Sequence, residues 1–451
     1  MKTVDIVERI EGEAKLICSW ENGIISDARI DFLNFRGFEY ILKDKPPLDA
    51  LVYTPRICGI CGQAHLKATV EALENLCSNF GKEVELTSKA KLLREIGLNI
   101  EIIDSHIKWF YMYIFPDIIK LETKDLDIYE PLKGKRWLEA SKVASETIKA
   151  LAIIGGQWPH TSYMIPGGVV SDPTLNDLVS MSNYMDNAIK FLEKSLIGVD
   201  LETYLTFDNL NDLEKLKGDL RYFKDLSFKY SLEKYGKSHN RFLTLGESSF
   251  FKAGKIKQRL INKIDLERIV ESSEYTFDMK DLQNNSSKHT WSKSVTYNSN
   301  FFETGPLSRA VIQGRKFIKE LHKNFDDSSF TRIMSRIDEL AHLLVNTKEL
   351  ISKININDKS HIKPLVDLKK IENGNGISVV EACRGSLYHK IEIKNGKIGT
   401  YDVITPTVWN LGPQNKFQKG VAQKAIIGLP NIELAKIVLR SFDVCSVCTT
   451  H

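Results

Sequence analysis

Two pairs of cysteines at opposite ends of the chain constrain its fold more than any other feature. Cys58 and Cys61 form one C-x-x-C motif, and Cys445 and Cys448 form a second motif close to residue 451. Two intervening residues allow both thiolates of a pair to bind one metal ion. In a large chain with an odd count of 7 cysteines, such pairs indicate a metal or redox site before structural disulfides. If both motifs bind one metal site, the two ends belong to one folded unit.

The ligand type alone leaves the metal open, because four thiolates suit zinc, iron–sulfur clusters and nickel. A structural zinc site usually closes a short loop, with its cysteine pairs about 12–20 residues apart. Here most of the chain separates the pairs, which disfavours zinc. A thioredoxin-like dithiol is also disfavoured, since no βαβ pattern surrounds either pair. Structural zinc stays as the alternative to a redox metal centre.

The spacing of apolar residues predicts a helical core between two β-rich ends. Asn22-Gly23 and Asn395-Gly396 are typical turns of β-hairpins. Strands are expected at Lys15–Trp20, Ile24–Phe35, Ile377–Glu381, Leu387–Ile393 and Ile398–Ile404. Helices are expected at Leu66–Phe80, Ala90–Phe115, Glu139–Ile154, Leu175–Ile197, Leu307–Asn324, Arg332–Lys353 and Asn431–Arg440. We therefore predict a single α+β domain over residues 1–451, with a long helical bundle as its core, small peripheral β-hairpins near both termini and a variable region at about 208–300.

Charge and hydropathy exclude several classes of protein. The net charge is only +4, and no basic stripe interleaved with aromatic residues predicts binding to nucleic acid. No run reaches the roughly 18 apolar residues that a membrane-spanning helix needs. The first residues, Met1 to Glu13, are charged and lack the apolar segment of a secretory signal. We expect a cytoplasmic protein, or one exported together with a partner and held at the periplasmic side of a membrane.

The residues around the cysteines resemble those of nickel–iron hydrogenase large subunits. The two signatures are Arg56–His65 and Asp443–His451, and together they are highly specific. Weaker supporting stretches occur in the family's order along nearly the whole chain: Arg9–Gly12, Arg36–Glu39, Pro159–Val169, Glu303–Leu307, Glu381–Gly385 and Pro406–Asn410. The related quinone-site subunit of respiratory complex I lacks the four cysteines, so their presence argues against that relative.

The resemblance implies a Ni-Fe(CN)2(CO) centre that cleaves H2 reversibly and heterolytically into protons and electrons. Cys58 and Cys445 would bind nickel terminally, and Cys61 and Cys448 would bridge nickel to iron. The three cysteines outside the two motifs cannot supply a chain of iron–sulfur clusters, so these clusters belong to a small subunit that takes up the electrons in an obligate heterodimer. A hydrogen-sensing regulatory subunit with the same site is the alternative function.

Four further residues gain roles from the resemblance. His65 would hydrogen-bond a bridging sulfur, Arg384 would stand over the open metal face, and Thr407 would hydrogen-bond a cyanide. The proton would leave by the thiolate of either Cys445 or Cys448, and Glu11 would then be its first carrier. Three of the four have an ordinary alternative: a local helix partner for His65, a structural ion pair for Arg384 and a surface charge for Glu11.

A second metal site is implied at the end of the chain. His451 and Glu39 would bind a magnesium or iron(II) ion, because a carboxylate suits a hard cation. The alternative for Glu39 is a surface salt bridge.

Four positions depart from the family's usual pattern. Ser105 stands where many relatives have an aspartate over the active site, and Cys383 replaces the proline before Arg384. Val444 replaces a proline, and Glu13 stands where histidine is common. The Cys383 thiol could donate a weak hydrogen bond near the diatomic ligands, or it could act as a small buried hydrophobe.

Overall fold

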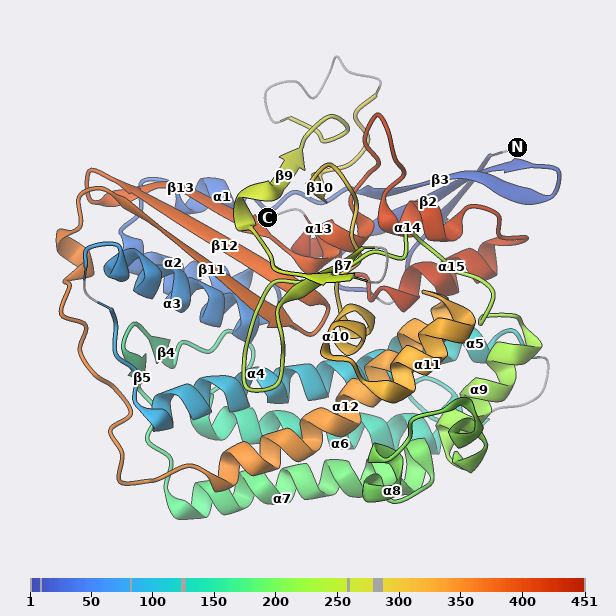
Figure 1. Cartoon of the computed structure of the whole chain (residues 1–451), viewed down its shortest axis with the longest axis horizontal. Coiled ribbons are helices and arrows are strands. Elements are labelled where there is room, and N and C mark those ends of the chain that lie inside the picture. Colours follow the sequence, from blue (N-terminus) through green and yellow to red (C-terminus); the bar gives the residue numbers. More distant parts are fainter. Residues whose placement is uncertain are drawn as a thin grey trace.

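The structure is a computed structural model in which a helical bundle underlies several small sheets (Figure 1). It describes residues 2–8, 10–81, 83–122, 127–257, 260–278 and 287–449. The predicted α+β class with a helical core is confirmed. No helix among these described residues is long and apolar enough to cross a membrane.

Four long helices form the bundle in the lower half of Figure 1: α4 (Ser88–Lys108), α6 (Lys135–Gly155), α7 (Leu175–Phe191) and α12 (Ser329–Ser352). Helix α4 packs against α6, α6 against α7, and α12 against both α4 and α7. Thr87, Thr174 and Ser328 cap three of these helices by accepting backbone N–H hydrogen bonds. The bundle thus has fixed helix starts and a continuous buried interior.

A three-stranded antiparallel sheet holds the helix that follows the first cysteine motif. Strands β11 (Gly374–Ala382), β12 (Gly385–Lys394) and β13 (Lys397–Ile404) are consecutive, and α3 (Gly62–Ser78) packs on β11 and β12. Gly376 permits this contact, since a Cβ there would lie 2.0 Å from the Ala72 carbonyl oxygen. The sheet therefore fixes the helix that starts directly after Cys61.

The two ends of the chain pack together. Strands β1 (Lys2–Ile6), β2 (Ala14–Glu21) and β3 (Ile24–Phe32) form a sheet whose apolar side packs on α14 (Val421–Ile426) and α15 (Ile432–Ser441). Beyond this sheet the Glu11 carbonyl accepts a hydrogen bond of 2.9 Å from the Ser446 N–H. The N-terminal segment therefore lies directly beside the second cysteine motif.

The remaining elements are short. The helices are α1 (Phe38–Leu42), α2 (Ala50–Tyr53), α5 (Phe115–Ile119), α8 (Leu201–Leu205), α9 (Asp219–Lys229), α10 (Pro306–Gln313), α11 (Lys316–Phe325) and α13 (Pro406–Leu411). The strands are β4 (Met164–Ile165), β5 (Gly168–Val169), β6 (Phe242–Thr244), β7 (Gly254–Lys257), β8 (Leu260–Asn262), β9 (Ile269–Ser272) and β10 (Ser294–Tyr297). Strands β6 to β10 lie in the region predicted to be variable.

Both predicted hairpin turns are confirmed, and two helix predictions are corrected. Asn22-Gly23 and Asn395-Gly396 have the positive φ angles of a tight hairpin turn. The helix expected to end before Pro116 continues through a π-helical turn into α5, where the proline occupies the first turn and needs no N–H partner. The helix expected over Leu307–Asn324 is two helices, separated at Gly314, which has φ 79°.

Candidate metal centre

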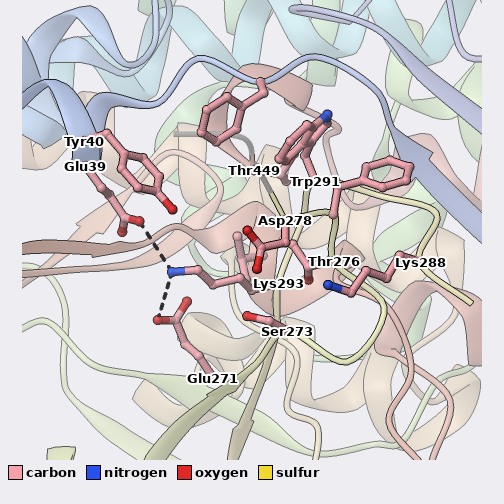
Figure 2. A pocket seen from close by; sticks show the side chains of 13 residues that line it. Glu39, Tyr40, Glu271, Ser273, Thr276, Asp278, Lys288, Trp291, Lys293 and Thr449 are labelled. Atoms are coloured by element: carbon pink, nitrogen blue, oxygen red, sulfur yellow. Dashed lines mark hydrogen bonds and ion pairs between the residues drawn. The ribbon is translucent and has the colours of Figure 1, made fainter. Parts of the chain in front are cut away.

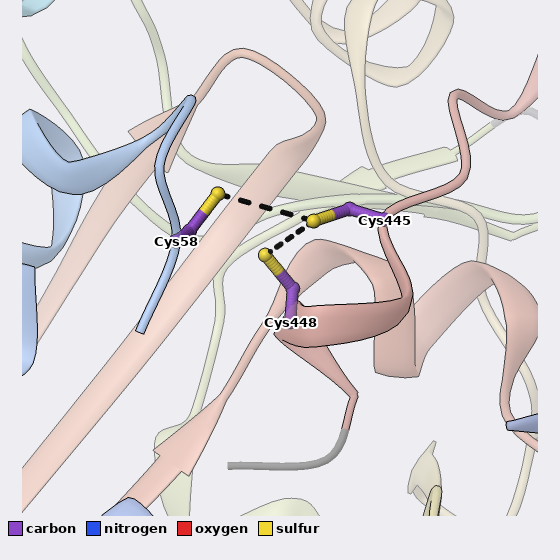
Figure 3. Close-up of side chains that lie close together, drawn as sticks. All are labelled: Cys58, Cys445 and Cys448. Carbon is purple, nitrogen blue, oxygen red and sulfur yellow. Dashed lines mark hydrogen bonds between the residues drawn. The ribbon is translucent and has the colours of Figure 1, made fainter. Parts of the chain in front are cut away.

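The four cysteines of the two motifs meet in the protein interior. Cys58 Sγ lies 3.9 Å from Cys445 Sγ, Cys61 Sγ lies 3.6 Å from Cys448 Sγ, and the sulfurs of Cys445 and Cys448 are 2.9 Å apart. Figure 3 shows the sulfurs of Cys58, Cys445 and Cys448 pointing toward one another from two separate backbone segments. All four residues are buried and none forms a disulfide. Burial raises the pKa of a thiol, but hydrogen bonds from the neighbouring cysteines hold the pKa of Cys58 below its usual range.

The first pair is fixed by the start of α3. Cys61 is the residue before this helix, and its N–H lies 3.2 Å from Cys58 Sγ. The buried carboxylate of Glu101 on α4 accepts the N–H groups of Gln63 at 2.7 Å and Ala64 at 3.1 Å. Glu101 thus caps the helix from another element, and burial raises its pKa. Glu101 is absent from the residues predicted from the sequence, and its one signal there is an acidic residue within the apolar run Ile100–Ile103.

Glu11 lies against Cys58 and Cys445, the two cysteines that the resemblance implies as terminal nickel ligands. Its Oε2 is 3.0 Å from Cys58 Sγ and 3.6 Å from Cys445 Sγ, and its Oε1 accepts the Gly59 N–H at 2.7 Å. Burial, followed by the nearby Cys58, raises the pKa of Glu11 to about 7. A carboxyl group with such a pKa can accept and release a proton near neutral pH.

Arg384 carries the positive charge of the site. Its Nε pairs with Asp443 Oδ1 at 3.1 Å, and its Nη1 lies 3.6 Å from Cys383 Sγ. Burial opposes its charge, but Asp443 and the surrounding thiols raise the pKa of Arg384. The Cys383 thiol is completely buried and interacts with the Ser105 hydroxyl. Ser105 and Cys383, two of the four departures from the family's pattern, therefore contact each other beside Arg384.

His65 and Thr407, two further residues that the resemblance implies at the centre, differ in the contacts they make. A ring nitrogen of His65 lies within 4.8 Å of the sulfurs of Cys61 and Cys448. Its Nδ1 is 3.0 Å from His389 Nε2, a partner on β12 that the sequence analysis missed. The hydroxyl of Thr407 on α13 is buried and has no hydrogen-bond partner within the described part of the chain.

The residues present fit a nickel–iron centre. Four converging, buried sulfurs are a donor set for soft metals. The Thr407 hydroxyl, which has no partner among the described residues, and the Arg384 guanidinium could donate hydrogen bonds to polar non-protein ligands of such a centre. Zinc would also accept four sulfurs, so the donor set by itself leaves both metals open.

Comparison with known families decides between these metals. The family model for nickel-dependent hydrogenases matches residues 36–125 and 132–451. This chain belongs to the nickel-dependent hydrogenase family. Within that family it is a large subunit that catalyses the oxidation of H2.

Individual relatives align with the hydrogenase chain from end to end. It is 23% identical to the periplasmic [NiFeSe] hydrogenase large subunit of Desulfomicrobium baculatum, with 100% of this chain and 94% of the relative covered. It is 24% identical to the hydrogenase-2 large chain of Escherichia coli K12, with 100% and 96% covered. The Ni-Fe-Se hydrogenase of D. vulgaris Hildenborough in its reduced state has the same fold, with a TM-score of 0.85, 22% identity and full coverage of both chains.

A cavity of about 220 Å³ in the hydrogenase lies beside Glu39, and we call it the Glu39 cavity (Figure 2). Glu39 Oε1 accepts the Val403 N–H at 3.0 Å, and Lys293 Nζ lies 3.4 Å from both Glu39 Oε2 and Glu271 Oε2. Thr449 lines the same cavity. His451, the other predicted ligand, lies outside the described residues.

Two more residues near the centre of the hydrogenase have no role in the prediction from sequence. Asp443 pairs with Arg384, and Arg336 pairs with Asp443 at 3.1 Å. Asp443 stands next to the second cysteine motif, and a charged residue in that place is a usable signal. Arg336 has no such signal, because only the tertiary fold brings α12 to the site.

Proposed function

We propose that this hydrogenase binds a nickel–iron centre with carbon monoxide and cyanide ligands on Cys58, Cys61, Cys445 and Cys448. The observation that carries the proposal is the convergence of four buried sulfurs from both ends of the chain. Cys58 and Cys445 would bind nickel alone, whereas Cys61 and Cys448 would bridge nickel and iron. When bound, this centre supplies the heterolytic cleavage of H2 into two protons and two electrons.

The surrounding side chains would orient the centre and its ligands. Arg384 presents a fixed cation that can hydrogen-bond an anionic ligand, and Asp443 holds it in place. The Thr407 hydroxyl would donate to a cyanide, and His65 would hydrogen-bond the sulfur of a bridging cysteine. Burial of the cysteines keeps bulk water away from these contacts.

Glu11 would receive the proton that leaves the centre. The support is geometric: its Oε2 lies within hydrogen-bond reach of Cys58 Sγ and close to Cys445 Sγ. A thiol of either cysteine can hand a proton to this oxygen without a change in backbone position.

The electrons would leave through a second subunit. The other cysteines are buried in different parts of the fold, Cys18 in β2, Cys77 in α3 and Cys383 in the turn between β11 and β12, so they form no cluster site in the described structure. An iron–sulfur small subunit would therefore complete the enzyme. A magnesium or iron(II) ion bound by Glu39 and His451 would stabilise the end of the chain. We also propose that the enzyme is cytoplasmic.

Hydrogen-dependent dye reduction tests this function directly. The complex is purified without oxygen from its own host, together with the subunits that accompany it. We expect H2 oxidation and an iron–sulfur protein in equimolar amount with this chain. A complex that contains neither activity nor an iron–sulfur partner would contradict the proposal.

A further inference from the structure

A series of buried charges leads from Arg384 away from the cysteines and into α12 and α4. Arg384 Nε contacts Asp443 Oδ1 at 3.1 Å, and Asp443 Oδ2 contacts Arg336 Nη1 at the same distance. All three residues are 3% exposed or less. Buried charges are stable only when they are paired, so these residues must be arranged as one unit.

Arg336 is the point at which this series branches. Its Nη1 lies 3.3 Å from the Cys383 carbonyl oxygen, 3.1 Å from Asp443 Oδ2 and 3.1 Å from His106 Nδ1. Cys383 directly precedes Arg384, and Asp443 pairs with the Arg384 side chain. One nitrogen of Arg336 therefore contacts both the backbone carbonyl before Arg384 and the Asp443 carboxylate, which orients the guanidinium of Arg384. The guanidinium carbon of Arg336 also lies 4.5 Å from the centre of the Trp109 ring.

His106 fixes Arg336 from the opposite side. Arginine can only donate hydrogen bonds, so His106 Nδ1 accepts and the ring proton resides on Nε2. That Nε2–H donates to Glu339 Oε1 at 2.9 Å, and Glu339 is held by Arg309 at 2.6 and 2.8 Å. A protonated ring would direct a second N–H at Arg336. The neutral ring is therefore a fixed acceptor, and burial lowers the pKa of His106 to about 4 in agreement.

We propose that Arg336, held by His106 and Trp109, is a positioning residue that sets the place of the Arg384 guanidinium at the metal centre. This inference rests on the proposed function. Arg336 makes no hydrogen bond to the four cysteines within the described structure, so its effect passes through Asp443 and the Cys383 backbone.

Arg336→Lys tests the inference, because lysine keeps the charge but lacks the planar fork that reaches several acceptors. In the purified complex we expect the carbonyl and cyanide infrared bands to shift while nickel stays bound. We also expect kcat to fall about 10- to 100-fold, as for a displaced active-site group. Arg94→Lys is the matched control: Arg94 is equally buried and pairs with Glu74 at 2.7 Å in another ion pair. It should lower the unfolding temperature without moving the bands.

Two further comparisons separate positioning from general stability. In an Arg384→Lys background, Arg336→Lys should add little further loss of kcat, because both substitutions act on the same interaction. His106→Gln, which offers one acceptor and one donor, should keep the wild-type bands, whereas His106→Leu should shift them. The histidine pair decides the question even if Arg336→Lys does not mature.

Two results would overturn the inference: unchanged bands in both Arg336→Lys and His106→Leu, or fully additive losses of kcat in the double variant. Wild-type protein without carbonyl or cyanide bands would instead contradict the proposed function. The two failures are therefore distinguishable in one set of spectra.

Discussion

The cysteine centre and the Glu39 cavity differ in the hydrogen-bond and ion-pair partners that their possible metal ligands already have within the protein. The four sulfurs are buried and contact one another, and two of them also contact Glu11. Glu39, by contrast, already accepts a backbone N–H and lies beside the Lys293 ammonium. Converging thiols gain most from a metal, whereas a paired carboxylate gains less. Losing the first site should abolish function, and losing the second should weaken it.

The largest effect should follow the removal of one sulfur from the centre. Cys445→Ala deletes a predicted terminal ligand, so we expect loss of nickel and of H2 oxidation below detection. Cys77→Ala is the matched control, since Cys77 is a buried free thiol on α3 away from the four. Metal analysis and dye reduction measure both outcomes. Retained nickel and activity in Cys445→Ala would contradict the ligand assignment.

Glu11→Gln should have the next largest effect. The amide keeps the shape of the side chain but cannot carry a proton, so H2 oxidation should fall by about a hundredfold or more with the metal retained. Glu13→Gln, two residues away on an exposed side chain, is the control and should behave as wild type. Turnover near the wild-type rate in Glu11→Gln would mean that the proton leaves by another route.

The difference between the two regions also separates what the sequence could predict from what it could not. The cysteines were predictable because the C-x-x-C spacing is local, and the hairpins because Asn-Gly favours one turn. The contacts of Arg336 with Asp443 and of Lys293 with Glu39 depend on residues more than a hundred positions apart. The spacing of apolar residues carries no information on such pairs. It also did not predict the π-helical turn after α4.

Glu39→Gln should produce a moderate effect that is specific to divalent cations. Magnesium at about 100 times its Kd should stabilise the wild-type fold by about 2.7 kcal/mol if it binds only the native state. The substitution should remove most of this gain and leave nickel in place. Thermal unfolding with and without magnesium measures this gain, and Glu267→Gln, an exposed change in the 3-10 helix Leu266–Arg268, is the control. Equal magnesium stabilisation of Glu39→Gln and wild type would remove Glu39 from the site.

The smallest effect is expected at Cys383. Burial raises the pKa of this thiol to about 11, so it remains protonated at neutral pH and can donate a weak hydrogen bond. Cys383→Pro should shift the cyanide infrared bands and change the recovery after exposure to oxygen, with the fold intact. Cys383→Ala separates the thiol from the backbone constraint of proline. Unchanged spectra and oxygen response in both variants would leave Cys383 a packing residue.

Metal content together with infrared spectroscopy tests the central claim most directly. The complex matured in its own host should contain nickel and iron in about equal amounts at this centre, with bands from carbon monoxide and cyanide. The four buried sulfurs then hold a redox centre, as their convergence from both ends of the chain indicates. Stoichiometric zinc on the four cysteines, with no nickel and no diatomic bands, would contradict it.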